Sequence, residues 1–246
     1  VTDQQGAFAT KTIEYKAKAI NAELLYTDKS TWLTAIGKTF KKNPAFSFQE
    51  RNPGLPNILI IGNSISIGYT PYVQNELNGI CNVYRIPTNG GYTRKCIENF
   101  ELWMGDNNWD VIHFNFGLHD MKRLVNNQLN IEGDNVVPQD EYGKNIAEIA
   151  RLLSTTKARL IWATTSVVPE GAAGRIKGEE VIYNNIALEV LKQFPLILID
   201  DQYSLTDKYS EDQREANVHF LDKGKGRQAK QVADHIKNAL HNESIE

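Results

Sequence analysis

Four short stretches of this 246-residue chain carry residue types that could together perform nucleophilic chemistry. They are Gly62-Asn63-Ser64, Asn89-Gly90-Gly91, Gly117-Leu118-His119-Asp120 and Asn217-Val218-His219. A serine hydroxyl is a weak nucleophile until a base within hydrogen-bonding reach removes its proton, so a distant histidine matters as much as the serine. Ser64 is therefore the candidate nucleophile and His219 the candidate base.

Each of these residues also has an ordinary structural explanation. A serine between a strand and a helix most often caps the helix, a single histidine most often makes a structural hydrogen bond, and glycine pairs usually mark turns. The functional interpretation gains weight from position, because each stretch follows a predicted strand. Ligands of open parallel sheets bind beyond the carboxyl ends of the strands, so we expect the four stretches to meet at one edge.

The rest of the chain supplies the elements that would position these residues. From residue 57 onward, strand-length apolar runs alternate with helical periodicity, which predicts a parallel sheet with helices on both faces. The predicted strands are Asn57–Ile61, Asn82–Ile86, Trp109–Asn115, Arg159–Thr164 and Leu196–Asp200. We expect an α/β, three-layer, flavodoxin-like fold whose five parallel strands take the order 2-1-3-4-5.

Helices are predicted where apolar residues recur at a spacing of three to four. The predicted buried stripes are Ile146, Ile149 and Leu153; Val181, Leu188 and Leu191; and Ala229, Val232, Ala233, Ile236 and Leu240. Residues 1–56 lie outside this rhythm and are interpreted as an N-terminal extension packed on the core formed by residues 57–246. Within the extension, Ile13, Ala17, Ile20 and Leu24 suggest one amphipathic helix, and the polar segment 122–140 is interpreted as a surface loop able to line a cleft.

Composition narrows the possible partners. A formal net charge of -3, from 27 basic and 30 acidic residues, gives no electrostatic reason to expect binding to nucleic acid or to an anionic membrane. No apolar run approaches the roughly 20 residues of a membrane-inserted helix. Because the sequence begins at Val1 without Met, we expect a periplasmic or secreted location rather than a cytoplasmic one. Cys81 and Cys96 could pair or remain buried thiols, and the oligomeric state is left open.

The four stretches resemble the sequence blocks of the SGNH, or GDSL-type, hydrolases, over roughly Asn57 to Leu240. Gly62-Asn63-Ser64-Ile65-Ser66 is similar to the block usually written Gly-Asp-Ser, which implies that Ser64 is the nucleophile and that its N–H is one oxyanion donor. Gly90 or Gly91 corresponds to the glycine of the second block. Gly117-Leu118-His119-Asp120 resembles Gly-x-Asn-Asp, and Ala216-Asn217-Val218-His219 resembles Asp-x-x-His. The resemblance implies an SGNH hydrolase-like domain over residues 57–246.

Three residues depart from the family pattern. Asn63 replaces an aspartate, and its amide keeps hydrogen-bonding capacity without the charge. His119 stands where the family has an oxyanion-hole asparagine, and an imidazole N–H can also donate to an oxyanion, most strongly if protonated. Ala216 occupies the position of the triad acid, so another group must orient His219. Glu215, another acid such as Asp212 or Asp222, or a backbone carbonyl could serve.

Further residues near these blocks could shape a substrate pocket. The candidates are Asn63, Asn89, Arg94 and Asp120, whereas Arg85 and Tyr92 are more simply explained as solvated surface residues. The acidic residues show no metal-ligand spacing, so no metal and no cofactor are expected.

The sequence thus predicts a serine esterase in which Ser64 and His219 form an acyl-enzyme, while the Ser64 N–H, Gly90 or Gly91 and His119 stabilise the oxyanion. A small-molecule or glycan ester is the expected substrate. An O-acetyl group on a carbohydrate is favoured, because the chain has no obvious apolar lid for acyl chains. The alternatives are an esterase or thioesterase for a non-carbohydrate ester and a catalytically weakened carbohydrate-binding protein. A nucleotide binder is disfavoured, since the first turn lacks Gly-x-Gly-x-x-Gly and Walker patterns.

Overall fold

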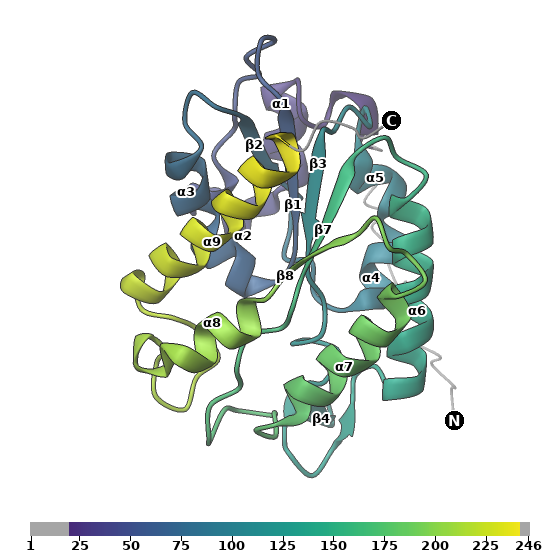
Figure 1. Ribbon diagram of the computed structural model, residues 1–246, viewed down its shortest axis with the longest axis vertical. Helices are drawn as coiled ribbons and strands as arrows, with labels where there is room; N and C mark the ends of the chain where they lie inside the picture. The colour runs from purple at the N-terminus through teal and green to yellow at the C-terminus, as the bar shows by residue number, and fades with distance from the viewer. Residues whose placement is uncertain (1–19, 242–246) are drawn as a thin grey trace, which may run out of the picture.

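The computed structural model describes residues 20–241 and contains a five-stranded parallel sheet between two layers of helices (Figure 1). Its strands are β1 (Asn57–Ile61), β2 (Asn82–Arg85), β3 (Val111–Phe114), β7 (Arg159–Ala163) and β8 (Leu198–Asp200). Their order in the sheet is β2-β1-β3-β7-β8. The predicted α/β class and the strand order 2-1-3-4-5 are therefore confirmed, although four of the five strands are shorter than predicted.

The two faces of the sheet bury alternate residues of each strand, as strand geometry requires. Ile58 and Ile60 of β1 belong to a cluster with α3 (Ser64–Glu76) and α9 (Asp222–His241). Leu59 and Ile61 belong to the larger cluster on the opposite face. That face is covered by α4 (Thr93–Glu98), α5 (Phe100–Met104), α6 (Gln139–Leu153) and α7 (Glu179–Leu191), whereas α8 (Gln202–Lys208) lies beside α9 (Figure 1).

The buried sides of the helices agree with the predicted stripes for α6 and most of α9. Ile146, Ile149 and Leu153 are fully buried in α6. In α7 the prediction is partly wrong, because Val181 and Leu188 are only half-buried. Its inward side is formed instead by Tyr183, Asn184, Ala187 and Leu191. An aromatic ring and an alanine can face the core as well as a branched aliphatic residue, and the aliphatic pattern alone misses them.

Residues 20–56 pack on the same core as the sheet. They form η1 (Ala22–Leu24), α1 (Lys29–Ala35), α2 (Gly37–Phe40) and η2 (Pro44–Phe46). Leu25, Trp32 and Phe46 are buried members of the larger hydrophobic cluster. Most of the predicted N-terminal amphipathic helix, including Ile13 and Ala17, lies outside the described residues.

A buried arginine connects this N-terminal segment to the turn after β1. Arg85 is 1% exposed, which corrects its interpretation as a solvated surface residue. Its guanidinium lies over the ring of Phe46, 4.3 Å from the centroid, and donates to the Gly62 carbonyl at 3.4 Å and to Ser66 Oγ at 3.3 Å. Burial lowers the pKa of Arg85 to about 9. The aromatic face and the two oxygens thus replace the water that this cation loses.

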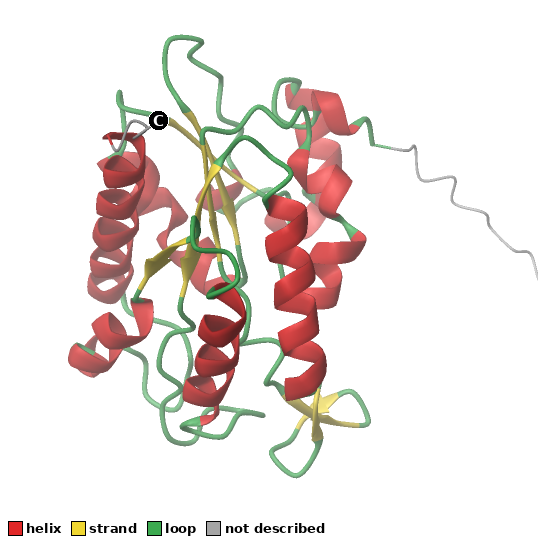
Figure 2. Ribbon diagram, turned by 45° about the vertical axis from the view of Figure 1, so that its right-hand side comes forward, coloured by secondary structure: helices red, strands yellow, loops and turns green. Residues whose placement is uncertain are grey.

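The polar segment 122–140 has regular structure that the sequence interpretation as a loop did not include. It forms a small antiparallel sheet of β4 (Arg123–Val125), β5 (Gln128–Leu129) and β6 (Asp134–Asn135), seen at the lower end of the molecule in Figure 2. Asn126 and Asn127 both adopt positive φ, at 50° and 62°, as a two-residue hairpin turn requires. The asparagine pair therefore marks a hairpin.

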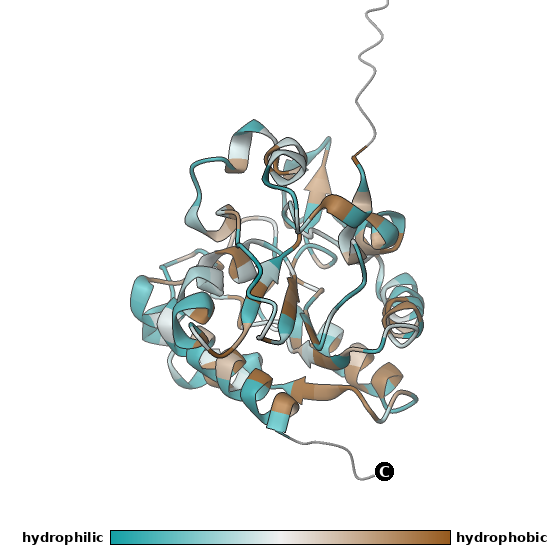
Figure 3. Cartoon of the chain, turned by 90° about the horizontal axis from the view of Figure 1, so that it is seen from above, coloured by the Kyte–Doolittle hydropathy of each residue, from teal (hydrophilic) through white to brown (hydrophobic). Residues whose placement is uncertain are grey.

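Hydrophobic residues are concentrated in the strands and on the inward sides of the helices, as the end-on view in Figure 3 shows. None of the helices within residues 20–241 combines the length and the apolar character that crossing a membrane requires. Cys81 and Cys96 are both buried and unpaired with each other.

Replacing Phe46 should weaken the whole fold. Phe46→Ala removes a ring that is 2% exposed, together with its contact to Arg85, and we expect a loss of about 3–5 kcal/mol in the free energy of unfolding. Urea denaturation followed by circular dichroism measures this loss. Leu24→Ala, at a side chain that is 45% exposed, is the control and should cost less than about 1 kcal/mol. Equal effects of the two variants would contradict the assignment of Phe46 to the core.

Candidate active site

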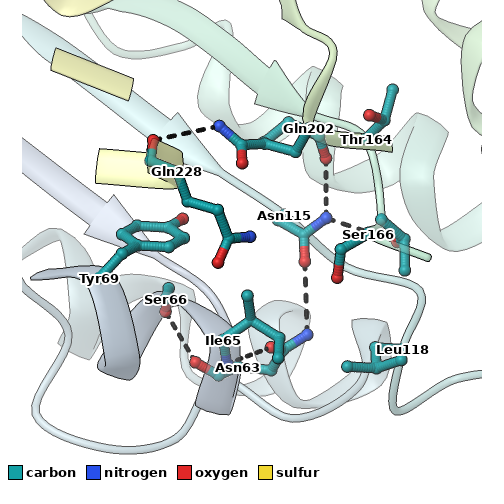
Figure 4. A pocket seen from close by; sticks show the side chains of 12 residues that line it. Asn63, Ile65, Ser66, Tyr69, Asn115, Leu118, Thr164, Ser166, Gln202 and Gln228 are labelled. Carbon is teal, nitrogen blue, oxygen red and sulfur yellow. Dashed lines mark hydrogen bonds between the residues drawn. The ribbon is translucent and has the colours of Figure 1, made fainter. Parts of the chain in front are cut away.

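Ser64 lies at the start of α3, directly beyond the carboxyl end of β1. Asn63 caps the helix, because its Oδ1 accepts a hydrogen bond from the Ile65 N–H at 2.9 Å. Its amide nitrogen donates to Oδ1 of Asn115, the residue after β3, at 3.3 Å (Figure 4). As the first residue of the helix, Ser64 has a backbone N–H without an acceptor inside the helix, at the positive end of the helix dipole.

His219 reaches Ser64 from the segment that precedes α9. Gln213 and Phe220 form an antiparallel bridge in this segment, and Gln213 Nε2 also donates to the Val167 carbonyl beyond β7 at 2.9 Å. His219 Nε2 lies 2.9 Å from Ser64 Oγ. The structure therefore brings the predicted nucleophile and the predicted base into hydrogen-bonding contact, although 155 positions separate them in the sequence.

Asn217 orients the imidazole ring. Its Oδ1 lies 2.7 Å from His219 Nδ1 and accepts a hydrogen bond from the His219 backbone N–H at 3.0 Å. The backbone N–H needs an acceptor, so this second bond assigns the oxygen of the amide to this side. Nδ1 must then carry the ring proton, which leaves the Nε2 lone pair facing Ser64. This is the tautomer that a general base requires.

The predicted acidic partner of His219 is absent from this position. Glu215 is exposed and makes no hydrogen bond to the His219 ring, and the other two candidate acids are engaged elsewhere within the described chain. Asp212 pairs with Arg227 and Lys223, and Asp222 pairs with Lys225. The suggestion of Glu215 is therefore replaced by Asn217, a neutral acceptor.

Sequence reasoning missed Asn217 because the family spacing places the acid three residues before the histidine, at Ala216. In the structure Ala216 has a φ of 48°, in the left-handed region, and the next residue turns toward the ring. The signal that could have identified Asn217 is local. An asparagine side chain commonly accepts a hydrogen bond from the backbone N–H two residues later, which also brings it beside that residue's side chain.

The two glycines proposed for the oxyanion hole have different roles. The Gly90 N–H donates to the Gly62 carbonyl at 2.9 Å, so this amide is committed to the backbone. A Cβ at Gly90 would lie only 2.8 Å from the same carbonyl oxygen, so no side chain fits there. The Gly91 N–H is bound at 3.0 Å by Oδ1 of Asn89, a side chain that rotation can remove. Of the two glycines, only Gly91 has an N–H that a side-chain rotation would free for another acceptor.

His119 lies on the turn after β3, half-buried and with a strongly lowered basicity. Burial, followed by the charges of Arg175, Lys122 and Lys95, lowers the pKa of His119 to about 3. The ring is therefore neutral near pH 7, so the stronger donation expected of a protonated ring does not apply. A neutral imidazole still carries one N–H, and within residues 20–241 no hydrogen bond occupies this ring.

The remaining predicted pocket residues are mostly structural. Asp120 is fully buried and accepts from the Thr93 N–H at 2.8 Å, from Thr93 Oγ1 at 2.6 Å and from the Gly117 N–H at 3.0 Å. Burial raises its pKa to about 6. Arg94 forms a bidentate pair with Glu141. Asn63 is 1% exposed and serves as the helix cap, which leaves Asn89 as the candidate beside the oxyanion site.

A narrow polar cavity lies behind the start of α3 (Figure 4). Gln202 and Gln228 face it from α8 and α9, and Asn115 faces it from the end of β3. The Gln202 Oε1 and both side-chain polar atoms of Gln228 have no hydrogen-bond partner in the described chain. The space is about 10 Å³, enough for one water molecule but not for an acyl group. An ester must therefore approach Ser64 from the solvent side.

No metal-binding arrangement is evident at the site. Among residues 20–241, no three His, Cys, Asp or Glu side chains gather where they could hold an ion.

Comparison with solved structures finds the same arrangement of strands and helices in hydrolases. A lipase/acylhydrolase from Enterococcus faecalis superimposes with a TM-score of 0.62 and 15% identity, over 74% of this chain and 96% of that chain. A GDSL-like lipase from Bacteroides thetaiotaomicron gives a TM-score of 0.58 and 15% identity, over 75% and 89%. The fold is that of the SGNH hydrolases. The acetylxylan esterase Axe2 from Geobacillus stearothermophilus superimposes with a TM-score of 0.59 and 15% identity, over 76% of this chain and 95% of that chain.

The resemblance of the four sequence blocks to SGNH hydrolases is thus confirmed at the level of the fold. No protein-family model matches the chain, and no curated protein matches it. The SGNH fold places all four blocks beyond the same edge of the sheet, as their order in the sequence predicts.

The pH dependence of ester hydrolysis should report the environment of His219. Burial, followed by the charges of Arg175, Arg214 and Lys225, lowers its pKa below the ordinary value of 6.5. A base with a lowered pKa stays unprotonated at lower pH, so activity should persist on the acid side of that value. The acid limb of kcat/KM, measured with an uncharged ester from about pH 4 to about pH 9, should have its midpoint below 6.5. A midpoint at or above 6.5 contradicts this environment.

Substitutions at Asn217 should test how the ring is held. Asn217→Asp supplies a charged acceptor that stabilises imidazolium, so kcat should rise and the acid limb should move to higher pH. Asn217→Ala removes the acceptor and should lower kcat by roughly 10- to 100-fold. Ala216→Asp is the matched control, because the Ala216 side chain faces Gly171, whereas the side chain that holds His219 is that of Asn217. The Ala216 Cβ lies 3.2 Å from the position that a Cβ on Gly171 would occupy. A larger gain from Ala216→Asp than from Asn217→Asp would show that the ring takes its partner from position 216.

Proposed function

We propose that this protein is a serine esterase that hydrolyses an ester, most favourably an O-acetyl group on a carbohydrate. The observation that carries the proposal is the 2.9 Å contact between Ser64 Oγ and His219 Nε2, with Nδ1 held by Asn217. A hydroxyl, a correctly oriented base and the Ser64 N–H at the start of a helix are parts that acyl transfer needs.

The reaction follows from the positions of these groups. His219 Nε2 accepts the Ser64 proton as Oγ bonds to the ester carbonyl carbon, and the carbonyl oxygen becomes an oxyanion. The Ser64 N–H, the Gly91 N–H and the His119 ring donate to that oxyanion, which is where negative charge develops. The bond to the sugar oxygen then breaks, and His219 returns its proton to the departing hydroxyl.

Water completes the cycle. Its proton passes to His219 as its oxygen attacks the acyl carbon, and the bond to Ser64 Oγ breaks. The acid is released and the proton returns to Ser64. Neutral N–H donors suffice for these steps, since each stabilises the oxyanion by a hydrogen bond in a partly water-excluded site.

An acetyl ester on a sugar agrees with the surroundings of Ser64. The cavity behind α3 has a volume of only about 10 Å³ and offers no tunnel for a long acyl chain. Acetyl xylan esterases are among the proteins with a similar fold.

A catalytically weakened carbohydrate-binding protein is the second candidate. The observation that favours it is Asn217, because a neutral acceptor cannot stabilise imidazolium as a carboxylate does. The exposure of this hydrogen bond weakens it further, since water competes for both partners.

Ser64→Ala should abolish the hydrolysis of 4-nitrophenyl acetate. Losing the nucleophile of a serine hydrolase costs up to about 10⁶-fold in kcat, so the remaining rate should equal the background. Ser154→Ala is the control, because the Ser154 hydroxyl donates to the Ala150 carbonyl at 2.7 Å at the end of α6. A fluorophosphonate probe should label the parent protein and the Ser154 variant at Ser64 in mass spectrometry.

Two results would overturn the esterase proposal. One is hydrolysis that persists in Ser64→Ala. The other is an inactive, unlabelled parent protein that nevertheless binds acetylated sugars in calorimetry, which would establish the binding-protein alternative.

A further inference from the structure

Four cationic side chains surround the candidate active site without carboxylate partners. They are Lys95 on α4, Lys122 after the turn that carries His119, Arg175 between β7 and α7, and Arg214 before His219. None of these four forms a salt bridge within the described chain. We refer to Lys95, Lys122, Arg175 and Arg214 as the cationic rim.

Cationic residues next to the rim in the sequence do have carboxylate partners. Arg94, next to Lys95, is paired with Glu141. Arg123, next to Lys122, is paired with Glu179 at 2.5 Å. The adjacent cations of the rim have no such partner. An unpaired cation that is partly buried carries a desolvation cost, so its retention points to an interaction that the isolated chain does not supply.

Backbone contacts hold two of the rim residues close to the catalytic groups. Arg175 Nε donates to the carbonyl of Leu118, the residue before His119, at 2.9 Å. Lys95 Nζ donates to the Asn89 carbonyl at 2.7 Å, and its side chain packs on Gly91, where a Cβ would lie 3.4 Å from Lys95 Cδ. Arg175 and Lys95 therefore lie next to His119 and Gly91, two of the proposed oxyanion donors.

Lys122 and Arg175 lie on neighbouring backbone segments, because the N–H of Arg123 donates to the Gly174 carbonyl at 2.8 Å. Burial, followed by the charge of Arg175, lowers the pKa of Lys122 and of both active-site histidines. Arg175 Nε and Nη1 are engaged with the carbonyls of Leu118 and Ala173, whereas no hydrogen bond within the described chain occupies its Nη2. Two like charges with a free guanidinium nitrogen are well suited to an anion between them.

Within residues 20–241, no carboxylate forms a salt bridge with any of the four rim residues. Asn63 and Ala216 are neutral residues where the SGNH blocks usually carry aspartates, and the Asn217 side chain that holds His219 is also neutral. The Asp120 carboxylate is fully buried and bound by Thr93 and Gly117. The whole chain carries a net charge of -3, so the positive rim runs against the overall balance. A positive patch of this kind attracts and orients an anionic substrate.

We propose that the sugar ester carries an anionic group, a carboxylate or a sulfate, which binds between Lys122 and Arg175 while the ester reaches Ser64. This inference rests on the proposed esterase function and names its substrate class. The anion supplies the charge that the rim lacks, and the bound sugar is oriented by it before the ester reacts.

The test compares acetylated substrates that differ only in charge. We expect kcat/KM for an acetylated methyl glucuronide to exceed that for the matching acetylated methyl glucoside by at least about 10-fold at low salt. A 6-sulfated glucoside with the same acetyl group separates sulfate from carboxylate recognition. Raising the salt concentration should reduce the preference for the charged substrate, because exposed charges are screened.

Variants locate the preference in the chain. Lys122→Met and Arg175→Met should each bring the charged-to-neutral ratio toward one, mainly through KM. Arg175→Lys should keep part of the preference, because it keeps the charge but loses the planar fork. Lys177→Met, at an exposed residue on the same loop as Arg175, is the control and should leave the ratio unchanged.

Binding provides a readout that does not depend on turnover. Calorimetry with Ser64→Ala should detect methyl glucuronide or the sulfated glucoside more strongly than methyl glucoside. Ser64-dependent hydrolysis without preference for either anion would overturn this inference and leave the esterase proposal intact. Preferential anion binding by a protein that hydrolyses no ester would overturn the esterase proposal while retaining the anion site.

Discussion

The hydrogen bonds to the Gly62 carbonyl hold the turn that carries Ser64, and the rest of the candidate site depends on them. This carbonyl accepts the Gly90 N–H at 2.9 Å and Arg85 at 3.4 Å, which joins the turn after β1 to the turn after β2. The approach is so close that only glycine fits at position 90. Arg85 in turn rests on Phe46, so the N-terminal segment supports the same turn from behind. Because Ser64 begins its helix two residues after Gly62, the direction in which the nucleophile points depends on these contacts.

The electrostatic character of the site differs from that of a serine triad with a carboxylate. A carboxylate stabilises the imidazolium that forms when serine loses its proton. Here the ring is held by the amide of Asn217, and its burial, followed by the charges of Arg175 and Arg214, opposes the formation of a positive charge. The neutral state of His219 is therefore favoured, which keeps the base available but makes it weaker. An anionic group on the substrate would offset part of this penalty in the complex, so substrate charge and catalytic rate would be linked.

The strands and their order could be predicted from the sequence, because buried apolar runs identify them. The partners of individual polar side chains could not. The five apolar runs identified the strands because both faces of a parallel sheet are covered, and the positions of Ser64 and His219 after strands placed them at one edge. Arg85 was misjudged because no residue pattern reveals a cation buried under an aromatic ring. Asn217 was missed because a single left-handed residue, Ala216, changes which side chain faces the ring. Gly90 and Gly91 could not be told apart until the acceptor of each N–H was known.

Ser64 and His219 belong to segments that begin two packed helices, α3 and α9, on one face of the sheet. Their side chains meet at 2.9 Å, and a relative shift of the helices by about 1 Å would take the two atoms beyond hydrogen-bonding range. The cluster that these helices form with the sheet includes small residues of α9 such as Ala229 and Ala233. The distance between Ser64 Oγ and His219 Nε2 therefore depends on how α3 and α9 pack against each other. A larger side chain in place of such an alanine would separate Ser64 from His219 and lower activity, although every residue that takes part in the chemistry would be unchanged.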